Sequence, residues 1–190
     1  ISREFYEGTI QNGERTVNNK NDYHIFDGKN VVWIDMPIFK GAESSFAHSY
    51  ARECEAERII EIIKNFLSKN EGRKLDIGII SFYKGQVELI NQRLKDSFPS
   101  SVLDSISCNT VDSYQGKEFD IVIVSGTRSN NHTDSRKSLG FIDASPSRIN
   151  VALSRARRLL IMVADADTYR RNTHFGNFIE YVKDEGYYGI

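Results

Sequence analysis

The chain has 190 residues, a net charge of −1 and an apolar content of 39%, the composition of one ordinary globular domain with a well-buried core. No apolar run approaches the roughly 18 residues of a membrane span and no signal peptide is visible, so we expect no membrane contact and a cytoplasmic setting. The near-zero charge excludes an overall basic field, so any contact with a polyanion would be local. The two cysteines, Cys54 and Cys108, lack metal-ligand spacing, and we expect reduced thiols and no bound metal.

Short, continuous apolar runs alternate with stretches in which apolar residues recur every three or four positions. The continuous runs predict strands over residues 30–36, 75–82, 105–111, 119–126 and 159–164. The helical spacing predicts helices over residues 50–68, 84–97, 148–157 and 174–185. Residues 37–49 and 128–146 are expected to be polar connections, and residues 1–29 an irregular N-terminal segment. The alternation predicts one α/β domain over residues 1–190, with a mostly parallel central sheet and helices on both faces.

A polar turn with a glycine at its centre precedes the strand predicted over residues 119–126. Gln115, Lys117 and Glu118 place an amide, a cation and a carboxylate around Gly116. The backbone of a glycine can adopt positive φ or approach a ligand closely. The turn fits either an ordinary polar loop or a loop that contacts phosphate and ribose.

A second segment, residues 148–157, contains Arg155 and Arg157 at its end and leads directly into the last predicted strand. A guanidinium group stays charged and matches phosphate oxygens with two parallel donors, so these arginines could hold a phosphate chain. They could equally cover the last turn of a surface helix, where cations favour the helix dipole. The two segments become informative when they are considered together.

In their order and separation the two segments resemble motifs V and VI of superfamily 1 helicases, in the up-frameshift-like (1B) branch. That branch shows V-D-x-F/Y-Q-G-R/K-E, an apolar strand ending near R-x-N, then G-F-L/I, and finally R-L/I-N-V-A-L/I-S/T-R-A-R/K. This chain carries the corresponding residues in the same order at 111–118, 128–130, 140–142 and 148–157. Residues 79–86, together with 5–8 and 11–13, are also similar to family segments. The resemblance covers nearly the whole chain and is weakest over residues 14–74.

The resemblance implies a three-layer RecA-like P-loop NTPase fold and, more narrowly, the second, C-terminal lobe of an ATP-dependent helicase. In such a lobe Arg155 would be the arginine finger that reaches the γ-phosphate of ATP. Gln115, Gly116 and Glu118 would line the nucleotide, with the backbone of Gly116 near the phosphates and Glu118 accepting from the ribose hydroxyls. Arg157 would be either a further nucleotide contact or an anchor for its own helix.

A separate group of residues is expected to follow a single strand of RNA or DNA. Tyr83 and Gln86 lie where a predicted strand passes into a helix, and a helix N-terminus with an aromatic side chain suits a nucleotide. Packing by Tyr83 and a solvated first-turn position for Gln86 fit the sequence equally well.

The resemblance adds further residues to this expected strand path. Thr110, Asp112 and Ser113 would contact backbone phosphates or sugars, as the family's motif V does. Arg128 and Asn130 would couple the strand to the nucleotide, although a plain loop fits them as well. The choice between RNA and DNA and the direction of travel are not fixed by these residues.

Motifs that the chain lacks are equally informative. No G-x-x-x-x-G-K-S/T occurs in the 190 residues, and no Asp-Glu pair ends a strand in the way that holds catalytic Mg²⁺. The phosphate loop and the magnesium ligands would therefore lie on an N-terminal RecA-like lobe of a larger parent protein. Alone, this chain is expected to be monomeric and neither to hydrolyse ATP appreciably nor to bind it tightly.

Two other functions compete with the motor interpretation. A RecA-like interaction or nucleic-acid-binding module could keep the fold without catalysis of its own. A nuclease would need clustered acids beside a lysine, and Asp112, Lys117 and Glu118 come near that composition. These carboxylates flank a turn, however, whereas a nuclease would carry them on a strand.

Overall fold

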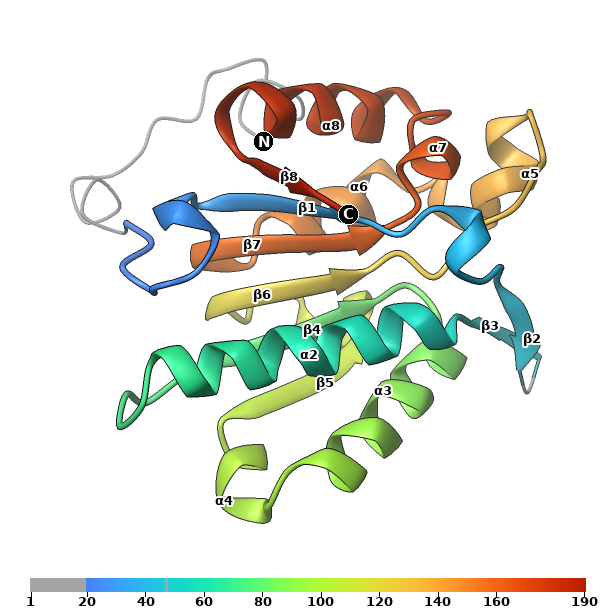
Figure 1. The fold of residues 1–190 in the computed structure, drawn as a ribbon. Helices are drawn as coiled ribbons and strands as arrows, with labels where there is room; N and C mark the ends of the chain where they lie inside the picture. The colour runs from blue at the N-terminus through green and yellow to red at the C-terminus, as the bar shows by residue number, and fades with distance from the viewer. Residues whose placement is uncertain (1–19, 47) are drawn as a thin grey trace.

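The computed structural model describes residues 20–46 and 48–190, which form a six-stranded sheet in the order β5-β4-β6-β7-β1-β8 (Figure 1). All paired neighbours in this sheet are parallel. Its strands are β1 (Val31–Asp35), β4 (Ile77–Ser81), β5 (Ile106–Thr110), β6 (Phe119–Ser125), β7 (Ala156–Ala164) and β8 (Tyr187–Gly189). Parallel strands joined by helical crossovers confirm the predicted α/β class. The family-like residues 5–8 and 11–13 lie outside the described residues.

Helices cover both faces of the sheet and give the domain three layers (Figure 1). On one face lie α2 (Glu53–Lys69) and α3 (Lys84–Ser97), and on the other lie α6 (Pro146–Leu153) and α8 (Thr173–Glu185). The short helices are α4 (Ser100–Leu103), α5 (Ser135–Leu139) and α7 (Ala166–Tyr169). No helix in the described part of the chain is both long enough and apolar enough to cross a bilayer.

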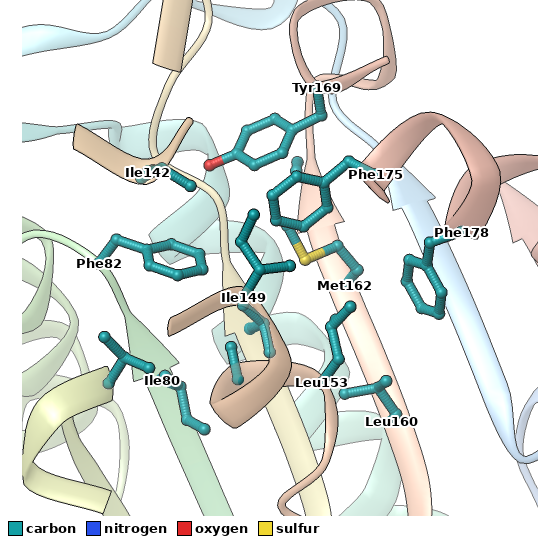
Figure 2. Packing of buried hydrophobic residues seen from close by; sticks show 14 of the residues in the cluster. Ile80, Phe82, Ile142, Ile149, Leu153, Leu160, Met162, Tyr169, Phe175 and Phe178 are labelled. Carbon is teal, nitrogen blue, oxygen red and sulfur yellow. The ribbon is translucent and has the colours of Figure 1, made fainter. Parts of the chain in front are cut away.

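The apolar spacing of the helices produces two cores, one on each face of the sheet. In α2, the residues Ile59, Ile63 and Phe66 are fully buried against one face. On the other face, Figure 2 shows Ile149 and Leu153 of α6 within the cluster of buried side chains. Each such side chain contributes on the order of 1.5–3 kcal/mol by leaving water. The burial of the periodic apolar residues is therefore a large contribution to the stability of the domain.

The connection from β5 to β6 is a parallel crossover without a long helix. Thr110 pairs with Ser81 at the end of β4, whereas Ile121 pairs with Ile77 at its beginning. The intervening chain, a 3-10 turn over Val111–Tyr114 and a loop over 115–118, therefore returns along the sheet. Two predicted site segments consequently lie at opposite edges: residues 110–113 near the ends of the strands, and residues 115–118 near their beginnings. We call these the carboxyl edge and the amino edge.

Both predicted polar connections contain regular structure. Residues 37–49 include β2 (Ser44–Phe46), which forms an antiparallel hairpin with β3 (Ser49–Ala51). Residues 128–146 contain α5 and a 3-10 turn over Gly140–Ile142. These elements are too short to show periodicity in the sequence. The start of α5 is stabilised by an N-cap, where the Asp134 side chain accepts from the Lys137 N–H.

The predicted C-terminal end of the helix over residues 148–157 was wrong. The helix α6 stops at Leu153, and β7 already begins at Ala156, so Arg155 lies in the junction and Arg157 in a strand. The sequence also gave no sign of β8, because its three residues gain strand geometry only by pairing with β1.

We expect Gly78→Ala to destabilise the domain, because a Cβ atom there would lie 2.3 Å from the ring of Phe119. Overpacking of this kind typically costs about 1–3 kcal/mol, measurable as a lower urea midpoint. If the clash is the cause, Phe119→Leu in the same chain should relieve part of the loss. Strict additivity of the two single changes would contradict this explanation.

Candidate functional site

The predicted nucleotide residues come together at the amino edge of the sheet. The Phe119 N–H, at the start of β6, donates to the Arg155 carbonyl at 3.0 Å. The turn that holds Gln115, Gly116 and Glu118 is therefore the immediate neighbour of Arg155, although the two are far apart in sequence. All three turn residues are exposed.

Gly116 has the backbone freedom that the turn requires. Its φ is +81°, a left-handed value that favours glycine. A Cβ atom at this position would meet nothing within 4 Å, so the space beside the glycine is open. An anion can approach the backbone there, and a substitution would be strained by its φ angle and not by crowding.

The guanidinium of Arg155 is oriented by neutral oxygens. Its Nε donates to the Val151 carbonyl at 3.2 Å, and its Nη2 donates to the Ser154 hydroxyl at 2.8 Å. Arg155 is half-buried and takes part in none of the ion pairs found among the described residues. Because neutral acceptors fix its direction without cancelling its charge, this cation is available for an external anion.

Arg157, by contrast, is held by carboxylates. Its Nε lies 2.9 Å from an oxygen of Asp120, and its Nη2 lies 2.5 Å from an oxygen of Asp76. The hydrogen bond with Asp120 is the main reason why the pKa of Arg157 is raised. A depression of about 450 Å³ beside this cluster is lined by both carboxylates, which makes it a poor receptor for phosphate. The geometry thus gives different surroundings to Arg155, which the resemblance makes the finger, and to Arg157, whose role the sequence left open.

At the carboxyl edge, Tyr83 and Arg128 form one buried unit. The guanidinium of Arg128 lies 4.3 Å from the ring centre of Tyr50 and donates to the Tyr83 hydroxyl at 3.2 Å. The Tyr83 hydroxyl donates in turn to the Leu139 carbonyl. Both side chains are nearly inaccessible, 6% exposed for Tyr83 and 5% for Arg128, so they shape this edge from beneath.

Glu43 fixes the segment that contains Arg128 and Asn130, and no sequence signal had identified it. One of its oxygens lies 2.8 Å from Nη2 of Arg128, and the other accepts from the Ser129 N–H and the Asn130 side-chain amide. Burial alone would lower the pKa of Arg128, but the hydrogen bonds with Glu43 and Tyr83 raise it. The arginine therefore remains charged and paired.

Gln86 lies inside the protein and does not line its surface. Its side-chain oxygen accepts from the Arg52 N–H at 2.6 Å, and its amide donates to the Arg52 carbonyl and the Ser125 hydroxyl. The side chain is 0% exposed and offers no free edge to a strand in this arrangement. Glu55, also fully buried, accepts from the Ser125 hydroxyl and the Thr127 N–H, so the network reaches the end of β6.

Thr110, Asp112 and Ser113 remain accessible at the end of β5. The hydroxyls of Thr110 and Ser113 lie 3.2 Å apart, and Asp112 pairs with Arg148 at 2.9 Å. Asp112 therefore lies near the carboxyl edge, whereas Glu118 immediately precedes β6 at the amino edge. The chain does not gather these acids, and the described residues contain no cluster of carboxylates, imidazoles and thiols able to hold a metal ion.

One sequence feature could have pointed to the buried network. Arg52 and Glu55 are spaced three apart where α2 begins, a pattern that is usually a surface pair. Here both side chains are fully buried, because the segment over residues 36–41 and the end of β6 pack around them. Burial of this kind is a tertiary property that the spacing alone does not indicate.

Comparisons with known proteins show similarity to an AAA domain family and to ATP-dependent helicases. A family model described as an AAA domain matches residues 1–167. The chain is similar to the ATP-dependent helicase upf1 of Schizosaccharomyces pombe, with 30% identity over 98% of the chain and 20% of that protein. It is also similar to the helicase/nuclease dna2 of the same species, with 36% identity over 73% of the chain and 9% of that protein.

Other relatives extend the same pattern. The Regulator of nonsense transcripts 1 homolog of Arabidopsis thaliana is 30% identical over 96% of the chain and 14% of that protein. The chain spans about a fifth or less of the length of these relatives. The solved C-terminal domain of a possible DNA helicase from Lactobacillus aligns with a TM-score of 0.45 and 15% identity over 83% of this chain and 88% of that one, a similarity too low to add to the argument.

Proposed function

Because the chain belongs to the AAA domain family and has up-frameshift-like superfamily 1 helicases among its homologues, we propose that it is the C-terminal motor lobe of an ATP-dependent RNA or DNA helicase. The lobe would close on an N-terminal RecA-like lobe that carries the phosphate loop and the magnesium ligands. ATP would lie between the two lobes. This chain would supply the arginine finger and part of the path for a single strand.

The observation that carries the proposal is the Arg155 guanidinium, a half-buried cation without a carboxylate partner among the described residues, beside an open glycine turn. Phosphoryl transfer needs positioned positive charge near the transferred group. Arg155 would provide that charge, and the amides around Gly116 would approach the phosphates. Gln115 and Glu118 would accept from or donate to the sugar end of the nucleotide.

Arg157 would act indirectly. With Asp76 and Asp120 already at its guanidinium, it would fix the start of β7, and hence the direction from which Arg155 leaves the sheet. Mg²⁺, when bound with ATP, neutralises phosphate charge. Its ligands would belong to the other lobe, since the described residues offer no metal cluster.

The strand path would run over the carboxyl edge. Thr110 and Ser113 present accessible hydroxyls for phosphates or sugars, and Asp112 lies between them. Tyr83, Gln86, Arg128 and Asn130 would hold this edge in shape from within. They would transmit the position of β6 to the surface, and the direct contacts would come from their exposed neighbours.

The proposal is tested by ATP hydrolysis in the helicase that contains this chain, with and without single-stranded RNA and DNA. We expect hydrolysis that one of the two polynucleotides stimulates, and no appreciable hydrolysis by the 190 residues alone. Polynucleotide binding without any hydrolysis by the whole protein would point instead to an interaction module that kept the RecA-like fold.

We expect Arg157→Ala to affect stability more than turnover. Partly exposed ion pairs contribute up to about 1 kcal/mol each, so the free energy of unfolding should fall by about that amount in a urea titration. Hydrolysis should remain within roughly tenfold of wild type, because the residue would not touch the phosphates. A loss of turnover as large as that from removing Arg155 would overturn the division of roles between the two arginines.

A further inference from the structure

Phe141 is an exposed aromatic residue that the proposed motor function leaves without a role. It lies in the 3-10 turn Gly140–Ile142, between α5 and α6, and its side chain is 42% exposed. Leaving a phenyl ring in water is unfavourable, and most large apolar residues near this edge are buried. Exposure alone does not mark a site, since Phe39 and Tyr181 are more exposed, so the surroundings of the ring decide.

Two neighbours fix the position of this ring. The Tyr83 ring packs against it edge to face at 5.2 Å, and the Arg148 guanidinium lies 5.6 Å from its centre. Ser145 links the two residues, because its hydroxyl donates to the Phe141 carbonyl and accepts from Arg148. These contacts cover part of the ring, and the residue remains 42% exposed.

The side chains beneath Phe141 form a closely packed and mostly buried unit. Tyr83 packs on Tyr50 at 5.4 Å, and Arg128 lies against both tyrosines. Gly140 has a φ of +59°, and a Cβ atom there would lie 3.1 Å from the Arg128 guanidinium. A glycine lets the turn approach this buried unit closely. The result is a series of rings, Tyr50, Tyr83 and Phe141, of which the last alone is exposed.

The residues near the exposed ring are polar. Arg148 connects it to Asp112 through a 2.9 Å ion pair, and Thr110 and Ser113 place their hydroxyls beside Asp112. A flat aromatic surface suits a base and hydroxyls suit a sugar or a phosphate, whereas the Arg148 guanidinium is already paired with Asp112. An apolar protein partner would require a wider apolar patch than a single ring, so the surroundings favour a nucleotide.

We propose that Phe141 is a base-stacking platform on the strand path, next to the accessible hydroxyls of Thr110 and Ser113. The inference rests on the proposed function, which supplies the single strand, and it adds a site that the motor role does not require. The Asp112 carboxylate would hold the Arg148 guanidinium beside the ring. Such stacking tolerates any base, as a translocating protein requires.

The test uses the helicase that contains this chain and fluorescein-labelled 12-nucleotide oligo(U) and oligo(dT), followed by anisotropy. Phe141→Ala should weaken binding about 5- to 150-fold, the range for losing one aromatic–base stack. Phe141→Tyr keeps the ring and should bind within about threefold of wild type, because stacking depends on the ring face. The concentration of strand that half-stimulates hydrolysis should rise in parallel for Phe141→Ala.

Tyr181→Ala is the matched control, since Tyr181 is a 53% exposed aromatic residue on α8. That helix packs over β1 and β8, at the other end of the sheet from β4 and β5. This change should leave strand affinity unaltered. All three variants should remain folded at the assay temperature in thermal melts, with Phe141→Ala melting somewhat lower because it loses the contact with the Tyr83 ring.

A second readout locates the strand directly. Oligo(U) with 5-iodouracil in place of uracil should photocross-link to Phe141 or a residue adjacent to it, as identified by mass spectrometry. Unchanged affinity of Phe141→Ala, with the cross-link elsewhere on a protein that still binds and hydrolyses, would overturn the stacking site alone. Failure of the wild-type protein to bind either oligomer would overturn both the site and the proposed function.

Discussion

Arg155→Ala is expected to abolish ATP turnover in the helicase that contains this chain, by about 10³- to 10⁵-fold, the range found for finger arginines in NTPases. The physical reason is that Arg155 is a half-buried cation at the amino edge and that no ion pair among the described residues offsets its charge. ATP binding should change little, because the phosphate loop of the other lobe would hold the ground state. Steady-state hydrolysis and titration of a fluorescent ATP analogue measure the two quantities separately.

Two controls make this result specific. Arg155→Lys keeps the charge but loses the forked donors that reach Val151 and Ser154, so it should recover only part of the activity. Arg136→Ala removes an exposed arginine from α5, which packs on α7 at the carboxyl edge, the opposite end of the strands from the nucleotide turn, and should leave turnover intact. If hydrolysis by Arg155→Ala stayed within tenfold of wild type, another residue would have to be the finger.

Arg52→Ala should be among the most destabilising single changes in the domain, lowering the free energy of unfolding by about 3–5 kcal/mol. The guanidinium is fully buried and pairs with Glu55 at 3.0 Å. It also donates to the carbonyls of Met36, Pro37 and Gly41. Removing it leaves one carboxylate and three carbonyls without this donor, each in a place that water cannot easily reach.

The chain contains a matched control for this change. Arg58 and Glu61 also lie three apart in α2 and pair at 2.9 Å, but with side chains 34% and 63% exposed. Arg58→Ala should cost about 1 kcal/mol or less. Urea unfolding of both variants compares the same chemistry at two depths, and equal losses would show that burial of the Arg52 pair does not determine its contribution.

The network around Arg52 also connects stability to the strand path. Glu55 accepts from the Thr127 N–H at 2.8 Å, and Thr127 has a left-handed φ of +73°. A threonine adopts this conformation only where its surroundings hold it there. Thr127 directly precedes Arg128, so the buried carboxylate sets the backbone from which the carboxyl-edge residues extend.

The periodic elements were predictable because their signal is local. Continuous apolar runs identified β1, β4, β6 and β7, and three- and four-residue spacing identified α2, α3 and α8, since burial of one face dictates both patterns. The short elements α5, β2, β3 and β8 escaped prediction. Each is defined by a cap or by pairing with distant residues, and neither leaves a period in the sequence.

The candidate site divides in the same way. Motif order was enough to indicate Arg155 and the turn around Gly116, and these segments do meet through the Phe119–Arg155 hydrogen bond. The sequence could not distinguish Arg155 from Arg157, because residue type says nothing about which guanidinium faces a carboxylate. The sequence likewise predicted that Gln86 lies on the surface, because the amphipathic pattern does not require a polar residue in a first helical turn to be buried.

By itself, then, the amino-acid sequence determined the layers of this protein and its family and indicated the segments that we propose carry its chemistry, all of which depend on patterns between near neighbours along the chain. The tertiary structure alone decided which cations are neutralised and which polar groups are buried. Asp76 and Asp120 reach Arg157, and Glu43 reaches Arg128, only after strands distant in sequence are aligned. Charge and desolvation depend on distances through space, and folding sets those distances.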